Sequence, residues 1–162
     1  MKYKIELKWA AGFAIMSMLW MLLERIVGLH SSNIDKHAVY TNFVAIPAIL
    51  IYVFAFLDKQ RSFYPDGISF KDGIIFGLFM TLFITLISPV NILITLYVIT
   101  PDFFNNAIEY AVKSGNMTQA TAQDYFNTGS YIMQGLIGAP IMGIITTVLV
   151  NSGIFAFNKY RK

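Results

Sequence analysis

The chain has 162 residues, of which 56% are hydrophobic, only 13% are charged and none is cysteine. Such a composition excludes a disordered chain and disfavours an ordinary soluble domain, in which about a quarter of the residues are charged. The absence of cysteine excludes disulfides and thiolate metal sites. The net charge is +3, but the sequence has no basic stripe with interleaved aromatic residues, so we expect no nucleic-acid partner.

Four apolar segments are long enough to cross a bilayer, which requires about 20 residues of helix. They cover residues 9–29, 39–57, 73–99 and 131–157. An isolated segment in lipid must satisfy its own backbone hydrogen bonds, so each segment is expected to be a helix. The sequence therefore predicts an all-α membrane protein with four transmembrane helices in a single polytopic domain, residues 1–162.

Lysine and arginine are unevenly distributed between the segments that connect the spans. The two terminal tails and the connection between the second and third spans carry nine of them, and the other two connections carry three when the first is counted from Arg25. Positive residues concentrate on the cytoplasmic side of membrane proteins. We therefore expect both termini in the cytoplasm, and we expect the basic surface there to contact membrane lipids with anionic headgroups.

Small and weakly polar residues recur every four positions in the third and fourth spans. They are Gly73, Gly77, Thr81 and Thr85 in the third span, and Gly135, Ala139, Gly143 and Thr147 in the fourth. Small stripes let helix backbones approach closely in lipid, and hydroxyl groups can form hydrogen bonds across the contact. We predict that these two consecutive spans pack along their stripes. The alternative interpretation is that the stripes form a homo-oligomer interface or a thin-walled conduit.

The connection between the third and fourth spans, residues 100–130, is the longest polar stretch. Thr100 is predicted to cap a first helix, which stops near Gly115. Thr118 is predicted to cap a second helix that runs to about Phe126. We expect an extracytoplasmic helical hairpin, which either packs as a lid over the helix ends or offers a surface to a partner.

Four polar residues lie in or near the apolar segments and form a candidate polar or lipid-phosphate site. They are Glu24, Arg25, Lys36 and Asn151. Ionisable residues inside a span often mark function, but adjacent residues on a helix are poor partners for each other. Arg25 is expected either to anchor its helix at the interface or to bind lipid phosphate or another ion with Lys36. Asn151 is expected either to form an interhelical hydrogen bond or to contribute to a polar site.

A metal site is the other chemistry that we considered, because His30, Asp35 and His37 follow the first span. Two imidazoles and a carboxylate are ligand types that zinc prefers. Their spacing matches no familiar zinc motif, so we predict no metal and no cofactor. The sequence also contains no metalloprotease, serine-hydrolase, phosphate-loop or dinucleotide-binding motif, and no catalytic residue is predicted.

These features favour a non-catalytic accessory or scaffold subunit that works through helix–helix contacts and its outer hairpin. The alternative is a membrane protein that handles a lipid or a small solute, with Arg25, Thr85 and Asn151 lining a polar path between the spans.

Two short motifs resemble a known family. Residues 66–73, with the sequence DGISFKDG, precede Gly77, and residues 99–103, with the sequence ITPDF, precede Met117 and Thr118. Their order and spacing resemble the bacterial membrane family catalogued as domain of unknown function 4199.

This resemblance covers roughly residues 40–162 and implies a small four-span protein of the inner membrane of Gram-negative bacteria. The family has no established activity, so the resemblance implies no catalytic residues. It motivates a membrane-linked glycosyltransferase as a partner to test, beside a homo-oligomer. The outer segment, which is acidic and rich in methionine in the family, carries neutral residues here: Asn105, Asn106, Gln119 and Gln123.

Overall fold

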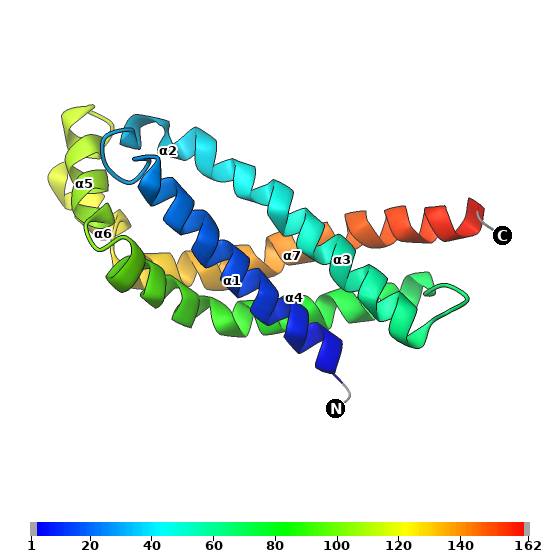
Figure 1. Cartoon of the computed structure of the whole chain (residues 1–162). Coiled ribbons are helices and arrows are strands. Elements are labelled where there is room, and N and C mark those ends of the chain that lie inside the picture. The colour runs from blue at the N-terminus through cyan, green and yellow to red at the C-terminus, as the bar shows by residue number, and fades with distance from the viewer. Residues whose placement is uncertain (1–2, 161–162) are drawn as a thin grey trace.

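The structure is a computed structural model that describes residues 3–160, and within this range it is helical without any strand (Figure 1). In chain order the elements are α1 (Lys4–Ile26), α2 (Ile34–Tyr40), the 3₁₀ turn η1 (Thr41–Val44), α3 (Ala45–Phe63), α4 (Phe70–Ile94), the π-helical turn η2 (Thr95–Ile99), α5 (Phe103–Lys113), α6 (Gln119–Tyr125) and α7 (Thr128–Tyr160). The predicted all-α class is confirmed.

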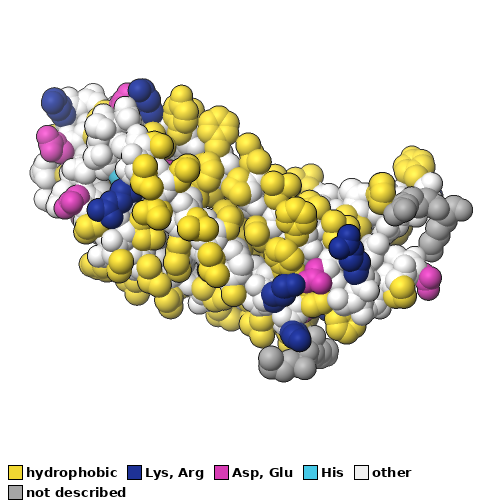
Figure 2. Space-filling model, in the orientation of Figure 1, with side chains coloured by type: hydrophobic (Ala, Val, Ile, Leu, Met, Phe, Trp, Pro, Cys, Tyr) yellow, Lys and Arg dark blue, Asp and Glu magenta, His cyan; other side chains and the backbone are white. Residues whose placement is uncertain are grey.

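Four helical stretches are long and apolar enough to cross a membrane, as predicted. They cover Lys4–Ile26, Ile34–Phe63, Phe70–Ile99 and Thr128–Tyr160. The second stretch is longer than the predicted segment because η1 keeps the chain helical between α2 and α3. Figure 2 shows hydrophobic side chains over the middle of the visible face, with most charged side chains gathered towards its two ends. This distribution is typical of a protein whose central band faces lipid.

The two ends of the bundle differ. Helices α2, α5 and α6 gather at one end, which we call the hairpin end (Figure 1). Helix α1 begins and α7 finishes at the opposite end, which we call the terminal end. Helices α4 and α7 are neighbours along much of their length, and α1 packs against both α3 and α4.

The close contact between α4 and α7 depends on glycines that face larger side chains. A Cβ atom on Gly73 would overlap the side chain of Asn151, and one on Gly77 would overlap Thr147. In the reverse sense, a Cβ atom on Gly143 would overlap Thr81. Each helix therefore supplies both the gaps and the side chains that fill them, which permits close approach of the two backbones.

The other three stripe residues take different positions. A Cβ atom on Gly135 would lie 2.6 Å from Ile92 Cδ1, so this glycine also approaches the α4 helix closely. The Thr85 hydroxyl donates to the carbonyl oxygen of Thr81 on its own helix, at 2.9 Å. Ala139 lies beside two surface hollows of the bundle.

The main core lies towards the terminal end, where α1, α3, α4 and α7 meet. The rings of Phe56 and Phe76 are fully or almost fully buried and stack edge to face, with centroids 5.0 Å apart. The Tyr52 hydroxyl forms a hydrogen bond of 2.9 Å with the Thr81 hydroxyl, and both residues are buried. This bond joins α3 to the α4 stripe and fixes the side chain that fills the gap at Gly143.

Replacing Tyr52 by phenylalanine is expected to lower the free energy of unfolding by about 1–2 kcal/mol, because the buried Thr81 hydroxyl loses a partner. Thermal unfolding in mild detergent measures the effect. The matched control is Tyr160→Phe, since Tyr160 is 90% exposed and its change should have little effect. Equal stability of the two variants would contradict the proposed role of this bond.

The connection between α4 and α7 forms two helices, but its start differs from the prediction. Thr100 does not cap α5: its backbone N–H donates to Thr95 O at 2.7 Å, because the π-helical turn η2 prolongs α4. Asp102 directly precedes α5 instead. Gly115, with φ of +73°, follows the end of α5, and Thr118 caps α6 by accepting a hydrogen bond from Thr121 N. The hairpin folds back over one end of the bundle.

Candidate functional site

Three ligand-type side chains meet at the hairpin end. Glu24 on α1 is fully buried, His30 in the following turn is 4% exposed, and His37 on α2 is half-buried. His30 Nε2 lies 2.9 Å from Glu24 Oε2, and His37 Nδ1 lies 3.6 Å from the same oxygen. One ligand atom from each residue lies within 4.8 Å of the others. We call these three residues the Glu–His cluster.

A tight turn brings the cluster together. Helix α1 ends at Ile26, and Gly28 then adopts φ of +81°, a conformation that side-chain-bearing residues rarely adopt. The turn is closed by hydrogen bonds from Leu29 N to Glu24 O and from Asn33 N to Gly28 O, of 2.9 and 2.8 Å. The reversal places His30 back against Glu24, and α2 then delivers His37 from the other side.

Helix α5 covers the cluster. The ring centroid of Phe103 lies 5.0 Å from that of His30 and 5.1 Å from that of His37. The side-chain amide of Asn106 donates to the backbone oxygen of His30 at 2.8 Å. Since Phe103 is buried and apolar, it shields the two imidazoles from solvent on this side. The hairpin is therefore part of the cluster's environment and holds the His30 turn in place.

Trp20 fixes the remaining carboxylate oxygen, because its indole N–H donates to Glu24 Oε1. Trp20→Phe is expected to lower the free energy of unfolding by about 1.5–3 kcal/mol, the range for hydrogen bonds to charged groups. Trp9→Phe is the matched comparison: Trp9 also donates to a carboxylate, that of Asp58, but Lys8 remains bound to the same oxygen. Thermal unfolding of both variants tests this, and a larger loss for Trp9→Phe would contradict it.

A cavity of about 350 Å³ adjoins the cluster. Glu24 and Trp20 lie on its wall, together with Lys36 and apolar side chains that include Tyr40 and Phe43. Lys36 is exposed, and its ammonium group lies 3.5 Å from Asn33 Oδ1. We call this the hairpin-end cavity. The cavity is open to the surface beside the buried Glu24, and Lys36 places a positive charge on its wall.

The four predicted polar residues do not form one site. Glu24 and Lys36 line the same cavity, whereas Arg25 donates to the carbonyl oxygen of Ile99 and ties α1 to η2. Asn151 lies towards the terminal end, where its side-chain amide donates to Phe70 O at 2.9 Å across the α4–α7 contact. Of the two roles expected for Asn151, an interhelical hydrogen bond or a place in a polar site, the structure shows the interhelical hydrogen bond.

The three residues considered from the sequence as metal ligands were His30, Asp35 and His37, and the structure brings together only the two histidines. Asp35 is exposed on α2 and does not belong to the cluster, and Glu24 supplies the carboxylate instead. The signal that could have identified Glu24 is Gly28, which lies between the end of α1 and His30. A glycine directly after a helix indicates a chain reversal.

A second feature is an apolar groove of about 550 Å³ in the side of the bundle. Helices α3 and α7 form its walls and diverge towards the hairpin end, while α1 and α4 contribute to its floor (Figure 1). Small residues of the walls are Ala45, Ala48, Ala139 and Gly143. We call it the lateral groove.

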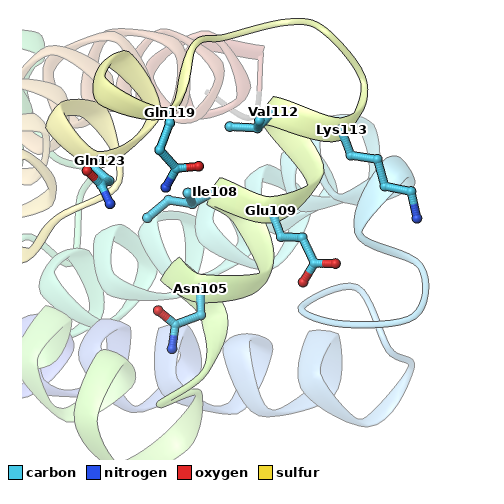
Figure 3. Close-up of a pocket in the computed structure, with 7 residues that line it drawn as sticks. All are labelled: Asn105, Ile108, Glu109, Val112, Lys113, Gln119 and Gln123. Carbon is cyan, nitrogen blue, oxygen red and sulfur yellow. The ribbon is translucent and has the colours of Figure 1, made fainter.

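A third feature is a shallow groove of about 420 Å³ between α5 and α6. Figure 3 shows Gln119 and Gln123 projecting from α6 towards α5, where Ile108 and Asn105 lie. This groove combines apolar side chains with side-chain amides, a mixture that is suited to contact with a protein surface. We call it the hairpin groove.

Comparison with known proteins gives one match. No curated protein and no solved structure matches the chain. The model of the family described as protein of unknown function (DUF4199) matches residues 8–155, which include all the cluster and groove residues described above. The resemblance in the two short motifs is thereby confirmed, and the chain belongs to the DUF4199 family.

Proposed function

We propose that the protein is a non-catalytic accessory or scaffold subunit of a complex in the bacterial inner membrane. Its lateral groove receives a transmembrane helix of a partner protein, and its hairpin contacts the part of that partner outside the bilayer. The observation that carries this proposal is the lateral groove, which opens from the bundle between α3 and α7 within two membrane-capable stretches.

The lining of the groove favours a helix as its occupant. Ala45, Ala48 and Ala139 present little more than backbone to the groove, and small residues allow a second helix to approach closely in lipid. Ser17 and Thr146 add hydroxyl groups that can form hydrogen bonds with that helix. Close approach and hydroxyl bonding together are typical of helix–helix contacts in membranes.

The hairpin groove gives the same partner a second contact. It lies beyond the end of the helical stretch that precedes α5, at the end towards which α3 and α7 diverge. A partner helix that leaves the lateral groove at this end would meet α5 and α6. A membrane-linked glycosyltransferase is the partner that we would test first, and a second copy of this chain the next.

Photocrosslinking tests the proposed occupant. A photoreactive residue replaces Met142 in the lateral groove or, as the control, Leu86, which is 64% exposed on α4 and outside the groove. Irradiation of intact membranes should join the Met142 position to one defined membrane protein. Crosslinks to the same proteins in equal yield from Leu86, or crosslinks from Met142 to lipid alone, would reject the proposal.

We further propose that the hairpin end faces the periplasm and that both termini are cytoplasmic. The lysine and arginine distribution supports this orientation. Because the chain has no cysteine, one introduced thiol is unique in the protein. Ser114→Cys in the hairpin should react with an impermeant maleimide in spheroplasts, whereas Ser62→Cys near the end of α3 should react only after lysis. The reverse pattern would invert the orientation.

Lipid handling is the second candidate, and the hairpin-end cavity favours it. The cavity combines largely apolar walls with Lys36, which suits a lipid that has an acyl chain and a phosphate. The predicted polar path receives no such support, since Thr85 and Asn151 bond to backbone oxygens of α4. Mass spectrometry of the gently extracted protein tests this candidate. Retention of one phospholipid, lost in Lys36→Gln, would favour it over the scaffold role.

A further inference from the structure

We propose that Glu24, His30 and His37 bind a divalent transition-metal ion, with zinc as the best fit. The ligand atoms are Glu24 Oε2, His30 Nε2 and His37 Nδ1. Two imidazoles and one carboxylate, with a fourth position for water, form an established type of zinc coordination. This site is separate from the lateral groove that carries the proposed scaffold role, because none of the three ligand residues lines that groove.

Two of the three distances between the ligand atoms are close to those around a tetrahedral ion. With zinc bonds of about 2.0–2.1 Å, neighbouring ligand atoms are about 3.3–3.5 Å apart. The observed distances from Glu24 Oε2 are 2.9 Å to His30 Nε2 and 3.6 Å to His37 Nδ1. One ligand atom from each residue lies within 4.8 Å of the others, so rotation of the side chains would have to draw the two imidazoles together around an ion.

An unpaired nitrogen atom at the same place points to a ligand. His37 Nδ1 is buried and has no hydrogen-bond partner among the described residues. The 3.6 Å between His37 Nδ1 and Glu24 Oε2 is too long for a hydrogen bond. Leaving a buried polar atom unpaired is unfavourable, and a metal ion bound by His37 Nδ1 would remove that cost.

The charge of the cluster also favours a cation. The Glu24 carboxylate is fully buried, and its two side-chain N–H donors, from Trp20 and His30, supply no full positive charge when the imidazole is neutral. Arg25, its neighbour in sequence, is turned to Ile99 O. A divalent ion would neutralise the carboxylate, while Trp20 would orient it from the outer shell, as is common for metal-bound carboxylates.

The surroundings bear on how an ion enters and on which ion binds. Glu24 is fully buried but lies on the wall of the hairpin-end cavity, so movement of its side chain would expose the carboxylate to that cavity. Phe103 closes the opposite side against the two imidazole rings. Imidazole ligands favour zinc, copper, nickel and cobalt over magnesium and calcium. We therefore expect zinc or cobalt to bind in preference to magnesium.

The test uses the purified full-length protein, stripped with a chelator and then titrated with Zn²⁺ against a fluorescent zinc indicator. One zinc ion per chain should bind, and His37→Asn should weaken binding by more than about 100-fold, since losing even an outer-shell partner of a ligand costs about 10–100-fold. Asp35→Asn is the matched control, because Asp35 is an exposed carboxylate two residues from His37, and it should bind like the unaltered protein. Equal loss in both variants, or no binding by the unaltered protein, would overturn the proposal.

Cobalt spectroscopy keeps the test decisive if His37→Asn fails to fold. Co²⁺ added to the unaltered protein should give the intense visible absorption of a tetrahedral site, and X-ray absorption of the zinc form should show two imidazole ligands. Excess Mg²⁺ should leave both signals unchanged. A zinc spectrum without imidazole scattering would show that the ion binds elsewhere and would overturn the assignment.

Discussion

Replacing Lys59 with methionine is expected to lower the free energy of unfolding by about 3–5 kcal/mol, the typical result of removing one partner from a buried ion pair. Lys59 on α3 lies 2.8 Å from Glu6 on α1, and their side chains are only 13% and 4% exposed. The ammonium group also lies near the rings of Phe63 and Phe76. Without it, the Glu6 carboxylate would remain buried with no cation to balance it.

Lys8→Met is the matched control, since Lys8 is 62% exposed and pairs with Asp58 near the same end of the bundle. Exposed pairs contribute only about 0–1 kcal/mol. The double variant Glu6→Gln with Lys59→Met should recover most of the loss, because it leaves no buried charge. Thermal unfolding in mild detergent measures all three proteins. If Lys59→Met and Lys8→Met were equally stable, the Glu6–Lys59 pair would have no special role in joining α1 to α3.

Replacing Gly143 with alanine is expected to cost about 1–3 kcal/mol, the usual penalty for overpacking a close contact. The added methyl group would overlap the Thr81 side chain on α4. Thr81 cannot move away freely, because its hydroxyl is bonded to Tyr52. Helices α4 and α7 would have to separate, and the contact that organises the bundle would weaken.

Gly138→Ala on the same helix is the control for helix propensity. No atom lies within 4 Å of a Cβ at Gly138, so this change should be neutral or slightly stabilising. Adding Thr81→Ser to Gly143→Ala removes the methyl group that is closest to the new one and should restore part of the stability. Equal unfolding temperatures for Gly138→Ala and Gly143→Ala would contradict the close approach of α4 and α7.

The helical stretches and the α4–α7 stripes could be predicted because both depend on local periodicity. An apolar run of sufficient length must be helical in lipid, and a repeat of four places Gly73 and Gly77 on one face. The glycines pack against Thr147, which belongs to the stripe of α7, and against Asn151, which lies one repeat of four residues further along α7. Local pattern was therefore enough to anticipate this contact.

The Glu–His cluster could not be predicted in the same way, because it depends on a chain reversal. The sequence places Asp35 between the two histidines, and proximity in sequence suggested it as the carboxylate. The turn at Gly28 instead folds His30 back on Glu24, across the end of α1. The lateral groove escaped prediction for a related reason: it depends on how far α3 and α7 diverge, which local residue patterns do not determine.

The proposed scaffold role is tested most directly by native mass spectrometry of the protein extracted from its own membranes in lipid nanodiscs without detergent. The unaltered chain should appear in a stoichiometric complex with one membrane protein. Ala48→Trp, which fills the lateral groove, should appear without that protein while its unfolding temperature stays close to that of the unaltered chain. Extraction of the unaltered chain alone or with lipid only, or an intact complex in Ala48→Trp, would contradict the account.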